Sequence, residues 1–303
     1  MTTMCQLTAE VGEDARFPEL ARGWFAGVLA DLLADVEAGL AAGRALYKRD
    51  PRDASVDTLW GEPHAVHAIL QVTRKPNGPI ARWVQYSPAA WRRFLDGMSG
   101  YPYGAVMGIT PLDENGRPFA DEGTATIEVS RLRNDPRWAT FSFTVGAALA
   151  GPSQVAGQWT AFARQQAEAM DAVYAEIGHS TSGFTLLEYA NGSRPERNIP
   201  QSRTRLRGYS WATLVPPELV GELGGIGALR ASGAFDQADE LSYGAAWLQA
   251  TANPGDYDEQ AARQVFEALA PVLIGGMAKR WPGRSHPPLA FGVNADDYRR
   301  QDA

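Results

Sequence analysis

Gly208-Tyr-Ser-Trp-Ala-Thr-Leu-Val215 is the clearest strand in this sequence, and it runs directly into Pro216-Pro-Glu-Leu-Val-Gly-Glu-Leu-Gly-Gly225. Every second residue of the first part is large, which predicts a strand with one buried face. The period then changes, because the two prolines suit a first helical turn and the leucines and Val220 recur at helical spacing. Gly224 and Gly225 accept positive φ and therefore end the helix.

Length and composition define the class of protein. The chain has 303 residues, 45% of them hydrophobic, enough for one large domain or two of about 150 residues. Cys5 is the single cysteine, so a disulfide framework and a cysteine metal cage are excluded, and we expect it in a loose N-terminal tail. Residues 1–11 do not resemble a secretory signal, and no apolar run reaches the roughly 20 residues that span a bilayer. These features predict a cytoplasmic protein without membrane contact.

Hydrophobic periodicity and turn residues predict the elements in chain order. Helices are expected over 17–47, 89–98, 153–177, 217–223 and 258–274. Strands are expected over 66–73, 80–86, 105–109, 124–131, 138–145, 184–189, 208–215 and 243–251, with a short one at 289–293. Loops are expected over 48–63, 191–207 and 228–240.

Short hairpin connections favour an antiparallel arrangement, so we predict an α+β fold with a largely antiparallel sheet flanked by helices. Two segments share the order strand, proline, short helix, glycine: 83–97 and 211–224. They suggest two related β-α-β-β-α halves, although unrelated joins could look alike. The expected organisation is an N-terminal helical segment and loop (1–63), a first half (64–190), a connecting loop (191–207) and a second half (208–303), which together are expected to form a single compact unit.

The stretch Gly208-Tyr-Ser-Trp-Ala212 is similar to the G-x-S-x-G nucleophile elbow of serine hydrolases. Asp236 or Asp256, followed by His286, would complete the chain order Ser, Asp, His of such an enzyme. In a true elbow the buried strand precedes the serine, whereas here it follows Ser210. We therefore expect Ser210 to be a strand residue and predict no catalytic residues.

The residues that could bind a metal ion also have structural explanations. His64 and His67 would point to opposite faces of a strand, and no third ligand lies near them in sequence. The acidic stretch 256–259 lies where a helix begins, so it is expected to cap amides and not to bind a cation. No metal and no cofactor are predicted.

Two further motifs have structural explanations. The glycines of 221–227 end a helix and lack the lysine of a phosphate loop. Five arginines in or near the loop 191–207 lack interleaved aromatic residues, so a solvated connector is favoured over a nucleic-acid contact: Arg194, Arg197, Arg203, Arg205 and Arg207. With a formal charge of −7, no nucleic-acid partner is expected.

Three motifs of the C-terminal half occur in a fixed order: Arg207 to Val215, Glu218 to Gly225, and Tyr243-Gly-Ala-Ala-Trp-Leu-Gln-Ala250 with Asn253-Pro-Gly-Asp256. In these motifs the chain resembles a type VI secretion immunity family. The resemblance extends more loosely over residues 150–275, and the N-terminal half departs from the pattern. The resemblance implies a non-enzymatic, cytoplasmic antidote that binds and blocks a cognate protein toxin.

An acidic antidote suits a basic toxin site, because complementary charge speeds encounter. The expected partner-binding residues are Asp236, Asp239 and Glu240. Two other functions stay open: a hydrolase that uses Ser210, and a structural or accessory component of a secretion or phage particle. The sequence leaves the oligomeric state undetermined.

Overall fold

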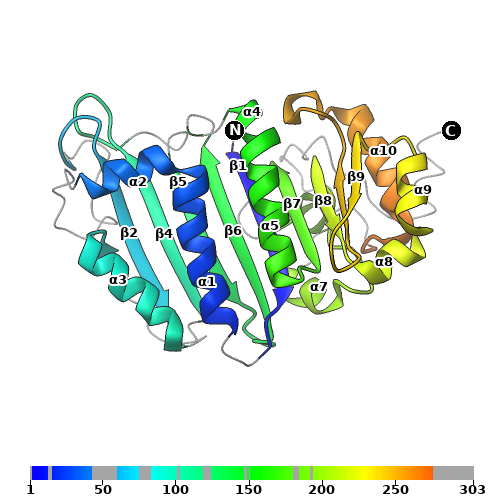
Figure 1. Ribbon diagram of the computed structural model, residues 1–303, viewed down its shortest axis with the longest axis horizontal. Coiled ribbons are helices and arrows are strands. Elements are labelled where there is room, and N and C mark those ends of the chain that lie inside the picture. Colours follow the sequence, from blue (N-terminus) through cyan, green and yellow to red (C-terminus); the bar gives the residue numbers. More distant parts are fainter. Residues whose placement is uncertain are drawn as a thin grey trace. The chain divides into compact units, whose positions relative to one another are not determined.

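The computed structural model forms two compact units, which are described separately below (Figure 1). The first unit comprises residues 1–3 and 11–151, and the second comprises residues 4–10 and 152–303. The structure describes residues 2–12, 16–42, 60–74, 83–100, 103–118, 124–146, 149, 151–179, 184–191 and 194–275. Within these residues no helix is long and apolar enough to cross a membrane.

The first unit packs helices against an antiparallel sheet. Its helical segments are α1 (Arg16–Gly27), η1 (Val28–Leu32), α2 (Ala34–Ala41), α3 (Pro88–Gly97) and η3 (Met98–Gly100). Its strands are β2 (Val66–Thr73), β3 (Val84–Gln85), β4 (Gly104–Pro111), β5 (Ala125–Arg131) and β6 (Trp138–Gly146). They lie in the order β3-β2-β4-β5-β6, and each neighbouring pair is antiparallel.

Aromatic side chains join the helices of the first unit to its sheet. The rings of Phe17 and Trp24 in α1 lie 6.1 and 6.0 Å from the ring of Phe141 in β6. Phe25 contacts Phe94 of α3 edge to face at 4.9 Å. The buried face of α1 is therefore the face that covers the sheet (Figure 1).

The second unit begins with most of β1 (Thr2–Glu10). Its helical segments are α4 (Pro152–Gln154), η5 (Val155–Trp159), α5 (Thr160–Met170), α6 (Leu186–Asn191), α7 (Pro195–Asn198), η6 (Ile199–Gln201), α8 (Pro217–Glu222), α9 (Gly225–Ala231), η7 (Pro254–Asp256), α10 (Glu259–Leu269) and η8 (Ala270–Val272). Its other strands are β7 (Tyr174–His179), β8 (Ala212–Val215), β9 (Gln237–Glu240) and β10 (Ala246–Gln249). The strand order is β1-β7-β8-β10-β9, and the pairs β7–β8, β8–β10 and β10–β9 are antiparallel.

The prediction of an α+β fold with a largely antiparallel sheet is thus confirmed in both units. The strand predicted over 208–215 is shorter and more buried than expected: β8 covers only Ala212–Val215, Ser210 lies before it, and residues 208–215 are all buried. Helix α8 follows as predicted, and Gly224 and Gly225 have φ of 85° and 84°. Asp258 caps α10 by accepting a hydrogen bond from the amide of Ala261 at 2.9 Å, as expected for an acidic residue at a helix start. The predicted strand at 289–293 lies outside the described residues.

The helix predicted over 153–177 ends seven residues early. Asp171 adopts the left-handed conformation with φ of 48°, and the chain then turns into β7. The residues from Ala172 to Ile177 are all buried, which is typical of a central strand covered on both faces. Helical spacing alone could not exclude this alternative, because a short apolar run fits either period.

Other corrections concern segments that were expected to be irregular or extended. Residues 184–189 were predicted as a strand but lead into helix α6, and the expected loop 228–240 contains most of α9 and all of β9. The expected loop 191–207 contains α7 and η6. Cys5 does not lie in a loose tail: it is fully buried in β1, and burial raises the pKa of its thiol far above the ordinary value.

Both segments of the suspected internal repeat form a strand followed by a helix. Ser87 caps α3 by accepting a hydrogen bond from the amide of Ala90, while α8 begins with Pro217 and has no side-chain cap. Their strands occupy different places, because β3 is the last strand of its sheet and β8 lies between β7 and β10. The local plan is shared, but the strand order is not.

Close packing requires a glycine at position 178 in β7, and this requirement provides a test of the fold. A Cβ at Gly178 would collide with the Ser210 hydroxyl, whereas a Cβ at Gly157, in η5, meets nothing within 4 Å. We expect Gly178→Ala to lower the free energy of unfolding by about 1–3 kcal/mol through overpacking. Denaturant titration followed by circular dichroism measures this.

Gly157→Ala is the matched control, and it should be neutral or stabilising by about 0.5–1 kcal/mol. Adding Ser210→Gly to the Gly178→Ala variant should restore most of the lost stability, because it removes the atom that the new methyl meets. If the double variant is no more stable than the single one, the collision is not the cause.

Candidate functional site

The predicted partner-binding residues lie at and just before β9, the last strand in the second unit's order. Asp236 and Glu240 are exposed, and Asp239 is half-buried. The register pairs Asp239 with Trp247 and Glu240 with Ala246. Because neighbouring strand residues point to opposite faces, Asp239 and Glu240 do not form one patch.

Asp239 is engaged within the unit. Its carboxylate accepts a hydrogen bond from Arg164 of α5 at 2.8 Å and another from Gln237. Burial acts to raise the pKa of Asp239, but Gln237 and Arg164 outweigh it and the pKa lies below its ordinary value. This ion pair places α5 on the face of the sheet to which Asp239 points.

The turn after β9 is also tied to α5. The amide of Ser242 donates to Glu168 at 3.1 Å, and the Tyr243 hydroxyl donates to the carbonyl oxygen of Ala172 at 2.8 Å. On the outer side of β9, Arg230 of α9 donates to the carbonyl oxygen of Ala238 at 2.8 Å. These contacts hold β9 in place, so its exposed carboxylates, Asp236 and Glu240, are presented on a fixed backbone.

Ser210 is not placed as a nucleophile. It is 4% exposed, its amide donates to Thr213 Oγ1 at 2.9 Å, and its hydroxyl lies against Gly178. Asp236 and Asp256 lie in exposed positions, and His286 lies outside the described residues. The strand β8 begins two residues after Ser210, so the context is the reverse of a nucleophile elbow, as predicted.

The two histidines have different environments. His64 is exposed with φ of 58°, and His67 is buried in β2 with its ring 4.8 Å from that of Trp60. Burial lowers the pKa of His67 to about 4, so it is neutral at physiological pH. In the part of the chain that the structure describes, no three residues of the types His, Cys, Asp or Glu are grouped to hold a metal ion.

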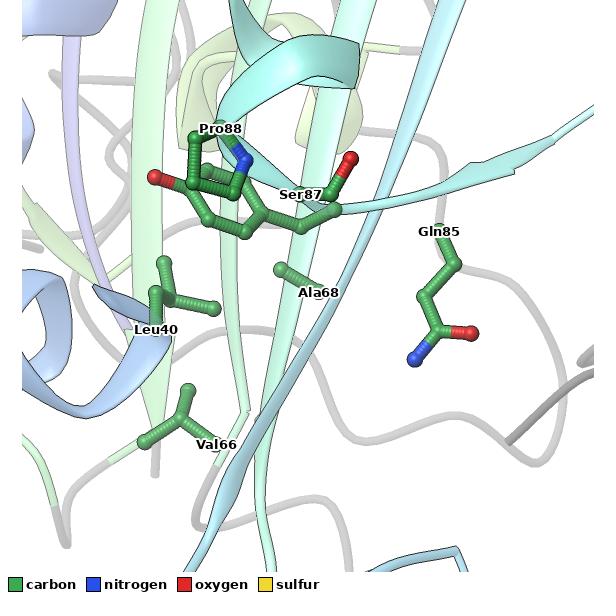
Figure 2. Close-up of a pocket in the computed structure, with 7 residues that line it drawn as sticks. Leu40, Val66, Ala68, Gln85, Ser87 and Pro88 are labelled. Atoms are coloured by element: carbon green, nitrogen blue, oxygen red, sulfur yellow. The ribbon is translucent and has the colours of Figure 1, made fainter. Parts of the chain in front are cut away.

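A small pocket lies in the first unit between α2, β2 and the start of α3 (Figure 2). Its volume is about 230 Å³, and its lining is Leu40, Val66, Ala68, Gln85, Tyr86, Ser87 and Pro88. Figure 2 shows Leu40 and Ala68 below Pro88, Val66 lower still, and Gln85 on the other side of the view. The lining contains no acid, histidine or basic residue, and the volume is below that of most small-molecule sites.

The arginine-rich segment holds the feature that sequence reasoning missed. Arg207 is fully buried, and its Nε and Nη2 donate to the two carboxylate oxygens of Glu188 at 2.9 and 3.0 Å. Its Nη1 donates to Thr8 of β1 at 2.8 Å, and its guanidinium lies 5.4 Å from the ring centroid of Tyr174. The segment is therefore not a solvated connector at Arg207, since this side chain forms a buried, bidentate ion pair.

Glu188 is held by further donors. The side-chain amide of Asn198 donates to it at 3.0 Å, as does the backbone amide of Thr185. The Thr185 hydroxyl donates to the carbonyl oxygen of Arg207 at 2.9 Å. A Cβ at position 208 would come within 2.6 Å of Thr185, so this position requires a glycine. The glycine directly after Arg207 is therefore the feature of the sequence that accompanies the buried arginine.

Comparison with solved structures shows that the fold is shared. The chain is similar to the Pseudomonas aeruginosa T6SS protein PA0821, with a TM-score of 0.57 and 13% sequence identity. The match covers 99% of this chain and 84% of that protein. No family model matches the chain, and no curated protein matches its sequence. At this identity the likeness concerns the fold.

Replacing Arg207 should destabilise the protein far more than replacing an arginine in an exposed ion pair. Arg207→Met leaves Glu188 as an uncompensated buried charge, so it should cost about 3–5 kcal/mol of unfolding free energy. Arg203→Met removes an exposed ion pair with Glu218 at 2.7 Å and should cost less than about 1 kcal/mol. Urea titration of both variants measures the difference, and equal costs would contradict the structural role of Arg207.

Proposed function

We propose that this chain is a cytoplasmic immunity protein that binds and occludes a cognate effector toxin of a type VI secretion system. The observation that carries the proposal is the fold shared with a T6SS protein over 99% of the chain. The resemblance of residues 150–275 to an immunity family supports it independently, because that resemblance rests on sequence motifs and not on overall shape.

The chemistry of the described residues supports a binding role over the hydrolase alternative. A serine hydrolase needs an accessible nucleophile, and Ser210 is buried against Gly178. An occluding protein needs a stable surface instead. The carboxylates at β9 are fixed by α5 and α9, and the chain carries a formal charge of −7. Both features favour a basic partner, through faster encounter.

Protection from toxicity is the direct test. Any candidate effector whose gene neighbours the gene for this chain is expressed from an inducible promoter, with and without the chain, and growth is followed. We expect survival only in the presence of the chain, and a stable complex of the two purified proteins by size-exclusion chromatography. Cells that die despite soluble expression of the chain would rule out an immunity role against that effector.

Charge reversal tests the predicted surface. Asp236→Lys with Glu240→Lys should slow association with the effector about tenfold at low salt, because steering by the acidic residues is lost. Surface plasmon resonance at two salt concentrations measures this, and the difference should shrink as salt screens the charges. Glu222→Lys, at an exposed position of α8, is the matched control and should leave the rate unchanged. Equal rates for all variants would place the contact elsewhere.

A structural or accessory role in a secretion or phage particle makes a different prediction. A particle component sediments with purified sheaths or tubes, whereas an immunity protein stays in the soluble fraction. Immunoblotting of the two fractions from the native host separates the alternatives, and recovery of the chain with particles would contradict our proposal.

A further inference from the structure

The buried cluster around Arg207 contains one cation and two carboxyl groups. Glu188 receives four donors, two from Arg207 and one each from Asn198 and Thr185. These donors satisfy both oxygens of an ionised carboxylate. The charge of Arg207 is therefore balanced by Glu188 alone.

Glu176 is the second carboxyl group and has no such set of donors. It is 3% exposed, and its Oε2 accepts one hydrogen bond from the Tyr174 hydroxyl at 2.8 Å. Its Oε1 has no hydrogen-bond partner in the described part of the chain. A buried anion with a single neutral donor is costly, and such a group avoids the cost by holding a proton.

Two other buried polar side chains near this cluster also lack hydrogen-bond partners among the described residues. They are the side-chain amide of Gln6 and the hydroxyl of Tyr257. Gln6 is two residues from Thr8 in β1, so both side chains point to the side where Arg207 lies. Tyr257 interacts electrostatically with Glu176.

We propose that Glu176 is a neutral carboxylic acid in the folded protein, and that its ionisation loosens strand β1 from the second unit. The link runs through Arg207. An ionised Glu176 would compete for the guanidinium, whose Nη1 now donates to Thr8 of β1. β1 is next to β7 in the strand order, and the amide of Val173 donates to the carbonyl oxygen of Thr8 at 2.9 Å, so Thr8 is one of the residues that join β1 to the second unit.

The charged and titratable groups that face Glu176 agree with a neutral state. Burial raises the pKa of Glu176 to about 7, partly offset by the hydrogen bond from Tyr174 and the charge of Arg207. The negative charge of Glu188 also raises the pKa of Glu176, because it disfavours a second negative charge nearby. Cys5 and Tyr257 are themselves kept neutral by burial, which raises the pKa of both.

The direction of the pH effect follows from this environment. When β1 is released, Glu176 meets water and its pKa returns toward the ordinary value of 4.5. The closed form then holds a proton that the open form gives up between pH 4.5 and about 7. Opening should therefore increase about 40-fold from pH 5 to pH 7 and level off above pH 7, when both forms are ionised.

Cys5 reports on the release of β1, because it is the single cysteine and is fully buried in that strand. The full-length protein is labelled with 4,4′-dithiodipyridine from pH 5 to pH 8, and each rate is divided by the rate for the unfolded chain at the same pH. We expect this ratio to rise about 40-fold from pH 5 to pH 7 in the wild type. In Glu176→Gln the ratio should stay constant, and in Glu222→Gln, an exposed control, it should follow the wild type.

Two further measurements use only the wild-type protein, so they do not depend on whether a variant folds. Infrared spectroscopy should show the carbonyl band of a buried, protonated carboxylic acid at pH 5 that fades through pH 7. Hydrogen exchange, divided by the intrinsic exchange rate of the unfolded chain at each pH, should show rising opening of Met4–Glu10 with pH while the opening of α10 stays constant. A missing band, a pH-independent ratio, or equal opening of β1 and α10 would each overturn the proposal.

Discussion

The structure of the second unit depends on the buried ion pair between Arg207 and Glu188. A buried pair is weak evidence for added stability, since desolvation consumes much of the attraction. Its value lies in specificity, because Arg207 has one arrangement that satisfies Glu188 and Thr8 together. The contacts fix the start of β8, helix α6 and strand β1, segments that are separated in sequence by up to 199 residues.

This constraint explains why an irregular part of the chain is so well ordered. Residues 194–210 contain only short helical turns, yet Asn198, Ser202, Arg207 and Ser210 are all buried. Their polar atoms bond within the segment, to Glu188, to Thr8 or to Thr213, so the backbone needs no long helix or strand to stay in place. The same arrangement packs Ser210 against Gly178 and removes it from solvent, which favours a role for the outer surface over a reaction at this serine.

Strongly periodic segments were predictable from the sequence, including β2, α3, β5 and α10. Alternation or helical spacing there agrees with the turn chemistry at both ends. Errors arose where the local pattern was ambiguous. The apolar run from Ala172 to Ile177 fits either period, and Arg207 was taken as solvated because most arginines are exposed. Asp236 and Glu240 are exposed as their polarity suggests, whereas nothing local marks Asp239 as the partner of Arg164.

The sequence by itself determined the α+β class, the antiparallel hairpins, the helix boundaries set by proline and glycine, and the acidic character of the chain. These follow from local preferences and composition, which act over a few residues. Only the tertiary structure decided which strand lies beside which, that Cys5 belongs to a core strand, and that one arginine of five is buried. Those outcomes depend on contacts between distant residues, whose energies no local pattern encodes.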